Sequence, residues 1–400
     1  MDDIQNILNA MAREAVSPQT AAVAIAVIGL NIHFGYTGLL NIGQSAFMLL
    51  GAYGFAITVK EGHPMILGVI IGLALAFVFA LVLGVPTLKL RGDYLAIVTI
   101  SAAEIIRYVG RSVGYEGLFN LTGGAQGIPG SQYRSPFTDL SFFGGGNTTL
   151  LSFNYTDVAG GSAIVRLIGW VIVIALIVMI VRIGKGKVAA LREGGPRTGA
   201  IVAAVVVTVF LVFFLAPVPN QNTGVRGWWF TAVAWVLVGV SVLLLMGLVR
   251  SPWGRALRGV REDEDAMRSL GKNVFAIKMQ ALVIGGLFGA LGGMLYVLPA
   301  TVQPDSLGRS ITFFCYTALL LGGAATIWGP VLGSLIFFVG RVMIIGVSGT
   351  YLSGDSPIAF MTNQQTSQFA FIVVGVVLML LVIFRPQGIL GDKRELRFNV

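Results

Sequence analysis

Long apolar runs separated by short polar segments dominate this chain. A bilayer hydrocarbon core about 30 Å thick needs roughly 20 apolar residues for each spanning helix. Eleven runs approach that length, at 18–34, 44–59, 64–86, 92–110, 162–183, 199–217, 228–249, 275–299, 312–325, 329–347 and 367–384. Because lipid leaves backbone polar groups to be satisfied internally, we predict an all-α, polytopic integral membrane protein, with some helices short or broken.

Charge is too scarce for a soluble protein. Only 11% of the residues are charged and 56% are hydrophobic, whereas about a quarter of a soluble domain is charged. The net charge of +9 would suggest a nucleic-acid partner in a soluble protein. In a membrane protein the same excess arises from basic residues that gather in cytoplasmic loops. We therefore predict a multi-pass protein that contacts membrane lipid and no nucleic acid.

The basic residues also predict orientation. They gather in the opening stretch, in the loop at 182–197 and in the tail at 385–400, which makes all three cytoplasmic. Alternation of the helices makes the polar loop at 111–161 external. The same alternation, counted backward, puts the N-terminus outside, so the sequence leaves the side of the opening stretch open.

No pattern in the chain points to an enzyme. A GxxxxGK[ST] phosphate loop does not occur, and neither His33 nor His63 has the spaced partners of a metal site or a catalytic triad. Cys315 is the only cysteine, so a thiolate metal site and a disulfide framework are unavailable. We expect no enzymatic activity, no cofactor and no metal, and we expect another chain to supply any ATP hydrolysis.

The segment at 250–274 is the most charged stretch and lies between two apolar runs. On a helical wheel its apolar residues fall toward one side, namely Leu257, Val260, Met267 and Leu270. The other side carries Arg258, Arg261, Asp265, Arg268 and Lys272. Because Asp263 and Glu264 intrude on the apolar side, two short helices or a helix and a turn are both possible. We predict an amphipathic element at a membrane surface, with a solvated loop as the alternative.

Two glycine-rich segments could expose backbone groups at membrane depth. The first joins the first two helices and includes Gly38, Asn41, Gly43, Gln44 and Ser45. The second lies in the external loop and includes Thr122, Gly123 and Gly124. Irregular backbone is tolerated in a membrane only where protein or a wet cavity covers it, and many transporters build substrate sites in this way. We predict part of a translocation path here, with a tight turn between helices as the alternative for the first segment.

Glu104 and Arg107 are the clearest charges within a predicted span, and their spacing of three puts them on the same helix face. Charge at membrane depth is costly and persists only when it is paired or faces a wet interior. We expect the two side chains to neutralise each other or a neighbouring helix. Lining of a substrate path is the alternative.

Glycine spacing also predicts helix packing. Gly285, Gly289 and Gly293 form two overlapping GxxxG steps on one helix face, which favours close approach of another backbone. Lys278 lies near the start of the same helix, so its long side chain should reach the membrane interface.

Several motifs, taken in order, carry a resemblance to a known family. They are GYTGLLNIGQSAF at 35–47, LRGDYLAIVTISAAEIIRYV at 90–109, TGGAQGI at 122–128, SPWGRALRGVREDEDAMRSLGKN at 251–273, LGGAATIWGPVLGSLI at 321–336 and RPQGILG at 385–391. The chain resembles the permease subunits of branched-chain amino acid ABC importers, of the LivM and LivH type and nearer the former. The order and spacing of these motifs agree with those of the family over most of the chain.

The resemblance implies a role for the charged segment. In such importers a cytoplasmic loop with the pattern E-A-A, three residues, then G docks into the ATPase subunit. Asp265, Ala266 and Met267, followed by Gly271, fit this pattern with Asp for Glu and Met for the second Ala. The implied coupling residues are Arg258, Arg261, Glu262, Asp265, Ala266, Met267, Arg268, Leu270 and Gly271. An apolar stripe would anchor the segment in a groove of the partner, and the charged face would set its register.

The resemblance also implies partners and a substrate. It implies two ATPase subunits on the cytoplasmic side, a second permease subunit, and a soluble binding protein that delivers leucine, isoleucine or valine. The location would be the plasma or inner membrane of a prokaryote. Related permeases carry urea or short amides, so the substrate stays open. An ion-coupled carrier or a channel for small polar solutes is the alternative class of protein. Such a protein would need several intramembrane carboxylates for coupling, and Glu104, which Arg107 already offsets, is too few.

Two departures from the family pattern are visible. Members often carry His at the position of Gln44 and Ser at that of Asn41, which leaves the roles of these side chains open. The family usually runs from the external loop through one helix into the coupling loop, whereas this chain has three helices there. We infer an inserted hairpin at 162–217, at the periphery of the permease.

Overall fold

The computed structural model of the chain describes residues 2–88, 92–111, 121–139, 228–351, 362–384 and 387–391. Nine of the eleven predicted membrane helices fall in these ranges, and each range is helical. The predicted hairpin at 162–217 lies outside the described residues. Within the described residues the only strand-like feature is one isolated bridge, so the all-α prediction is confirmed.

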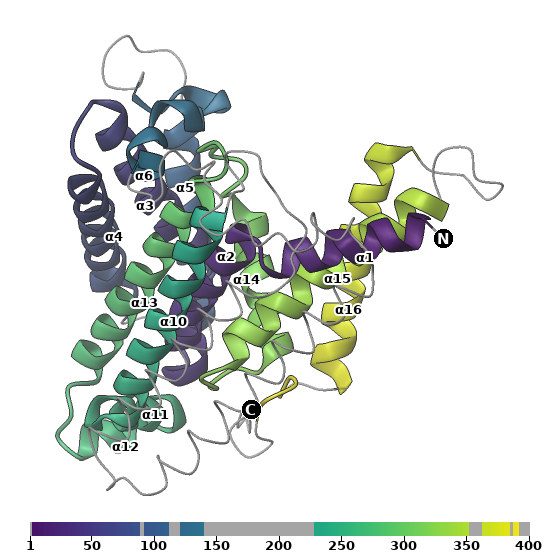
Figure 1. Cartoon of the computed structure of the whole chain (residues 1–400). Helices are drawn as coiled ribbons and strands as arrows, with labels where there is room; N and C mark the ends of the chain where they lie inside the picture. The colour runs from purple at the N-terminus through teal and green to yellow at the C-terminus, as the bar shows by residue number, and fades with distance from the viewer. Residues whose placement is uncertain are drawn as a thin grey trace, which may run out of the picture.

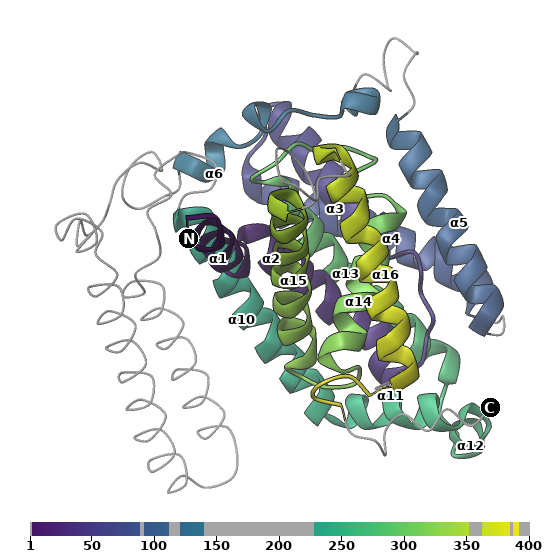
Figure 2. The same ribbon diagram turned by 90° about the vertical axis from the view of Figure 1, so that its right-hand side faces the viewer.

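The long helices form one bundle (Figures 1 and 2). In chain order they are α2 (Pro18–Leu30) with its π-helical extension η1 (Asn31–Tyr36), α3 (Gln44–Lys60), α4 (Met65–Thr87), α5 (Gly92–Arg111), α10 (Trp228–Arg250), α13 (Val274–Val297), α14 (Arg309–Gly322), α15 (Gly329–Tyr351) and α16 (Asn363–Phe384). The short helices α11 (Pro252–Glu262) and α12 (Glu264–Ser269) lie at one end, here called the α11 end. The opposite end, here called the α6 end, carries η3 (Gly124–Gln126), η4 (Gly130–Gln132) and α6 (Ser135–Asp139).

Five described helices are long and apolar enough to cross a membrane. They are Pro18–Tyr36, Met65–Thr87, Phe230–Arg250, Val274–Val297 and Gly329–Thr350. Helix α3 is shorter because it begins inside the bundle, where the Gln44 side chain donates a hydrogen bond to the Ala26 carbonyl in the middle of α2. Irregular chain at 37–43 leads to this point from the α11 end. The expected broken helix is therefore present.

The glycine face of α13 permits close contacts with two neighbouring helices. A Cβ at Gly293 would overlap the Met48 carbonyl oxygen on α3, and one at Gly285 would overlap the Gly29 carbonyl oxygen on α2. Backbones at this distance leave no room for any side chain. The close packing predicted from the GxxxG spacing is confirmed, and α13 forms the centre of the bundle.

The opening stretch forms a helix that the sequence reading did not include, α1 (Asp2–Ala15). Figure 1 shows it running across the bundle toward the start of α2, and Ile7 packs against Gly346 near the end of α15. This places α1 toward the α6 end. The tail segment 387–391 lies at the α11 end, where Ile389 and Leu390 donate backbone hydrogen bonds to Leu321 and Gly322. The two ends of the chain thus follow the alternation of the helices, and α1 does not share a side with the tail.

Candidate functional site

Helix α2 continues toward the α11 end as a π-helix, η1. A π-helix is rare, and single turns of it occur most often at functional sites. Gly35 is required there, because a Cβ would overlap the Asn31 Oδ1 atom and lie 2.6 Å from the Ala325 nitrogen. The missing side chain lets the turn between α14 and α15 approach the η1 backbone.

Asn31 holds that turn through both atoms of its side-chain amide. Its Nδ2 donates to the Thr326 carbonyl at 2.8 Å, and its Oδ1 accepts from the Ala325 nitrogen at 2.8 Å. Ala325 has a φ of 61°, and it is the one non-glycine residue with positive φ among the described residues. Left-handed backbone costs an alanine about 1–2 kcal/mol. The two hydrogen bonds from Asn31 help to offset this cost.

His33 lies in the same π-helix and is fully buried. Its Nε2 lies 3.1 Å from the Leu282 carbonyl oxygen on α13, and its Nδ1 lies 3.0 Å from the Asn41 amide nitrogen. Only the neutral ring with its hydrogen on Nε2 satisfies both contacts, since Nε2 must donate and Nδ1 must accept. Sequence spacing missed this role because Leu282 comes from a remote part of the chain.

The first predicted path segment surrounds His33 at mid-bundle. The Asn41 Oδ1 accepts from the Gly43 nitrogen at 2.8 Å, and the Tyr316 hydroxyl donates to the Asn41 carbonyl at 2.9 Å. Gln44 is fully buried, and its Oε1 is the only buried side-chain oxygen or nitrogen of the described residues without a hydrogen bond. Broken helices and buried polar groups thus meet here.

The remaining residues of that segment connect it to two other elements. The Ser45 backbone nitrogen donates a hydrogen bond to the Thr312 hydroxyl on α14 at 3.0 Å. Gly38, with a φ of 75°, lies against the Arg261 side chain on α11. The segment therefore spans from the α11 end to the middle of the bundle.

The second predicted path segment lies elsewhere. Gly123 and Gly124 form a tight turn with positive φ at the α6 end, and Thr122 precedes them. Just beyond, Ile128 and Val302 exchange backbone hydrogen bonds of 3.0 and 3.1 Å. The structure thus places the two glycine-rich segments at different levels and does not bring them together.

Two residues fix this region of the α6 end to the end of α13. The Tyr133 hydroxyl donates to the Val297 carbonyl at 2.7 Å, and the Arg134 Nε donates to the Leu298 carbonyl at 2.8 Å. Burial raises the pKa of Tyr133, which keeps its hydroxyl protonated and able to donate.

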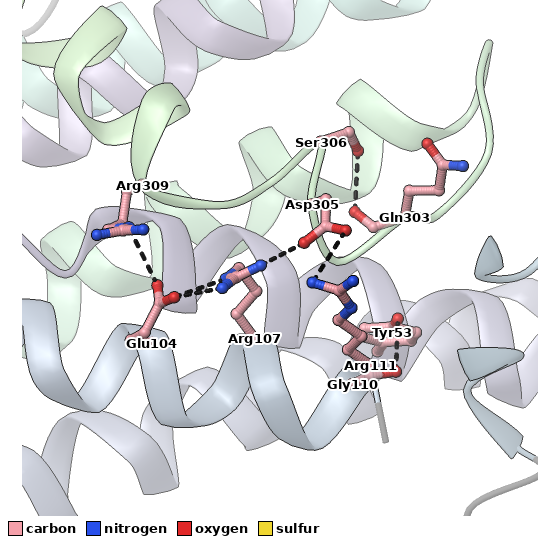
Figure 3. A network of polar contacts seen from close by, with 9 residues as sticks. All are labelled: Tyr53, Glu104, Arg107, Gly110, Arg111, Gln303, Asp305, Ser306 and Arg309. Carbon is pink, nitrogen blue, oxygen red and sulfur yellow. Dashed lines mark hydrogen bonds and ion pairs between the residues drawn. The ribbon is translucent and has the colours of Figure 1, made fainter. Parts of the chain in front are cut away.

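Glu104 and Arg107 form an ion pair within a larger network (Figure 3). Arg107 also pairs with Asp305, Arg309 lies 3.5 Å from Glu104, and Arg111 lies 3.8 Å from Asp305. The last turns of α5 are thereby joined to the connection between α13 and α14. Sequence spacing could reveal only the pair of Glu104 and Arg107, because Asp305 and Arg309 lie about two hundred positions further along the chain.

Loss of the central cation should affect stability. Arg107 is 12% exposed and neutralises both Glu104 and Asp305, so we expect Arg107→Ala to lower the unfolding free energy by about 2 kcal/mol. Arg111 is 48% exposed, so Arg111→Ala should cost less than about 0.5 kcal/mol. Thermal unfolding of the purified permease in detergent compares the two variants. Equal shifts would contradict the central role of Arg107.

The charged segment forms two short helices, α11 and α12, one of the two arrangements that the sequence left open. Asp263 ends the first and caps the second, because its carboxylate accepts from the nitrogens of Asp265 and Ala266 at 2.9 Å each. Glu264 pairs with Lys278 on α13. The acidic residues that break the apolar stripe therefore have structural partners, and the largely buried Lys278 reaches a carboxylate of this chain at the bundle end.

The predicted apolar stripe does not form one exposed surface. Leu257 and Val260 are buried in this chain, Met267 packs against Gly259, and Leu270 is 73% exposed. The expectation that the whole stripe anchors in a partner is wrong for α11. A helical wheel shows which residues share a face, but it does not show which chain covers that face.

Two arginines of α11 also turn toward this chain. Arg261 donates through Nη1 to the Gly35 carbonyl of η1, and Arg258 lies over the Tyr36 ring, 5.7 Å from its centre. An exposed side remains on α12, where the side chains of Asp265 and Arg268 are 89% and 62% exposed. Seven of the nine implied coupling residues are exposed, namely Arg258, Glu262, Asp265, Ala266, Arg268, Leu270 and Gly271.

A bundle of membrane-length helices, broken at mid-depth and bonded at one end to an amphipathic helix pair, defines a multi-pass membrane transport subunit. The chain belongs to the family described as "Branched-chain amino acid transport system / permease component", which matches residues 14–383. It is a permease component of an ABC importer.

The comparisons include bacterial and archaeal relatives. The chain is 28% identical to the high-affinity branched-chain amino acid transport system permease protein LivM of Escherichia coli K12, over 95% of this chain and 70% of the relative. It is 28% identical to a probable LivM of Methanocaldococcus jannaschii over 42% of this chain and 48% of the relative. The LivH protein of Escherichia coli K12 is 29% identical over 40% of this chain and 47% of the relative. No solved structure matches the chain significantly.

Proposed function

We propose that this permease carries leucine, isoleucine and valine across the plasma membrane of a prokaryote, together with a second permease subunit. Two ATPase subunits bind the α11 end, which faces the cytoplasm, and a soluble binding protein delivers substrate at the α6 end. ATP hydrolysis belongs to the ATPase subunits, and this chain has no enzymatic activity of its own. The substrate is supported by the relatives, which are named as branched-chain amino acid transport permeases.

One observation carries the coupling part of the proposal: α12 is exposed, whereas α11 packs against the bundle. Helix α12 presents Asp265 and Arg268 to the outside, whereas α11 buries Leu257 and bonds η1 through Arg261. Met267 of α12 packs against Gly259 of α11, so a partner that moves α12 also moves α11. The buried contacts and the charge-assisted hydrogen bond of α11 then pass this movement to the bundle.

From η1 the contacts continue to the middle of the bundle. Asn31 bonds the turn between α14 and α15, and His33 bonds both Asn41 and the α13 backbone. Helix α2, which continues into η1, and α13 both contact Gln44, because its side chain bonds Ala26 on α2 and lies against Gly289 on α13. The Oε1 atom of Gln44 has no hydrogen bond. In the proposed cycle, displacement of η1 opens this region to substrate, and Gln44 Oε1 becomes available to a ligand donor.

Reconstitution tests the function. The complex purified through this chain is placed in proteoliposomes, and uptake of radiolabelled leucine is measured with and without ATP. We expect ATP-dependent uptake that unlabelled isoleucine and valine inhibit. Inhibition by urea or acetamide instead would show that the substrate is urea or a short amide. Uptake by this chain alone under an ion gradient would exclude the ATP-driven importer mechanism.

Charge reversal on α12 tests the docking surface. Asp265 and Arg268 are exposed, and within the described part of the chain their side chains pair only with residues of α12. We therefore expect Asp265→Lys or Arg268→Glu to weaken the affinity for the ATPase subunits about tenfold or more. Arg13→Glu, on the exposed face of α1 at the other end, is the matched control. Co-purification of the ATPase with each tagged permease gives the result. Full retention in the α12 variants would place the docking surface elsewhere.

A further inference from the structure

Helix α1 takes no part in the function described so far. It runs across the bundle (Figure 1), and its C-terminal end is fixed by three hydrogen bonds. The Trp235 indole donates to the Val16 carbonyl at 3.0 Å, while the Thr20 hydroxyl and the Ser17 nitrogen both donate to the Glu14 carbonyl, at 2.8 and 3.1 Å. The depth of α1 relative to α10 and α15 is therefore set by the fold.

The contacts of α1 give that depth. Trp235 lies seven residues after the described start of α10 at Trp228, and Gly346 lies five residues before the end of α15 at Tyr351. At a rise of about 1.5 Å per residue, these contacts lie about 10 Å and about 8 Å inside the helix ends. Helix α1 is thus level with the outer turns of the spanning helices. An indole at this level fits the enrichment of tryptophan at membrane interfaces.

One face of α1 is apolar, and α15 covers only part of it. Its larger apolar residues recur at helical spacing, at Ile4, Ile7, Leu8 and Met11. Ile7 packs against Gly346, whereas Ile4 and Leu8 are 55% and 57% exposed. Asn6 and Arg13 lie on the opposite side of the helix and are exposed too.

We propose that α1 lies in the membrane interface at the α6 end, with Ile4 and Leu8 in contact with lipid acyl chains and with Asn6 and Arg13 facing water. Amphipathic helices of this kind bury their apolar face about 5–10 Å into the boundary between headgroups and acyl chains, which is the depth of α1. The exposed apolar surface continues onto α15, where Met343 and Val347 are each 44% exposed. Lipid covers both surfaces.

This contact has a structural consequence. Helix α1 continues into α2 after a two-residue break and packs along α15, so one interfacial helix ties both to the same leaflet. Asn31 joins the inner ends of the same two helices, since it bonds the turn that begins α15. The α2 and α15 pair is thus held at both ends, by lipid-anchored α1 at one and by η1 at the other.

Spin-label accessibility tests the lipid contact in the complete complex in phosphatidylcholine nanodiscs. Cys315 is the only cysteine and is buried, so Leu8→Cys, Asn6→Cys and Val347→Cys each present one exposed site for a nitroxide. Molecular oxygen concentrates in acyl chains, and a neutral nickel chelate stays in water. We expect the labels at Leu8 and Val347 to collide more with oxygen than with nickel, and the label at Asn6 to show the reverse.

Two outcomes would overturn the proposal. Equal nickel accessibility at Leu8 and Asn6 would put both faces of α1 in water. Low accessibility of Leu8 to both reagents would show that protein covers it, either the second permease or the binding protein. The same measurement on the complex without the binding protein separates these two, because only a contact with the binding protein then disappears. The result is independent of the transported substrate.

Discussion

Substituting Arg261 with alanine is expected to reduce ATP-driven uptake about tenfold or more while the ATPase subunits remain attached. Arg261 makes the hydrogen bond that joins α11 to the Gly35 carbonyl of η1, and its side chain also lies against Gly38. A hydrogen bond from a charged donor contributes about 1.5–3 kcal/mol, which corresponds to roughly tenfold to a hundredfold in an equilibrium constant. Its loss removes the charge-assisted hydrogen bond between α11 and the η1 backbone.

Uptake and ATPase retention must be measured on the same preparation of the Arg261→Ala complex. ATP hydrolysis that continues without matching uptake is the expected sign of uncoupling. Arg261→Lys is the conservative control, because an ammonium can still donate to the Gly35 carbonyl, and it should restore part of the uptake. Normal uptake by Arg261→Ala would show that force reaches the bundle by another route. This phenotype differs from that expected for Arg268→Glu, which should lose the ATPase itself.

Replacing Gly293 with alanine is expected to cause a large loss of stability. The added Cβ would overlap the backbone carbonyl of Met48, which cannot turn aside as a flexible side chain could. Overpacking in a tight core costs typically about 1–3 kcal/mol, and contact with backbone belongs at the upper end of that range. We therefore expect a lower unfolding temperature and a lower yield of folded permease.

Gly340→Ala is the matched control for that substitution. Gly340 is also inside a spanning helix, but a Cβ there would meet nothing within 4 Å. Because alanine favours a helix over glycine by up to about 1 kcal/mol, this variant should be as stable as the parent protein or slightly more stable. Thermal unfolding in detergent shows the sign of each change. A stable Gly293→Ala permease would mean that α3 and α13 separate at little cost.

The membrane helices could be predicted because bilayer thickness imposes a length on every span, and length is a local property of the sequence. Helix α1 escaped that criterion, since it is only 14 residues long and amphipathic. The start of α3 at Gln44 agrees with the predicted run at 44–59, but its depth in the bundle was not predicted. Gln44 lies at mid-bundle because its side chain bonds Ala26 of another helix, and nothing in the local sequence specifies that depth.

The site was predicted in part. The sequence indicated the broken segment at Asn41 and Gln44, but it passed over Asn31 and His33, whose partners at Ala325 and Leu282 come from distant elements. Likewise, Glu104 and Arg107 were recognisable as neighbours on one helix, whereas Asp305 was not. Side chains that pair within a turn can be read from spacing, and pairs across helices depend on how the helices pack.

By itself, the sequence determined that this chain is an all-α membrane protein, where its most charged segment lies, and which glycines allow helices to touch. These follow from helix length, composition and spacing, which need no knowledge of neighbours. Only the tertiary structure decided that Leu257 and Arg261 face inward while Asp265 and Arg268 face outward. The reason is physical, because a helix fixes which residues share a face, and only packing against other elements decides what covers that face.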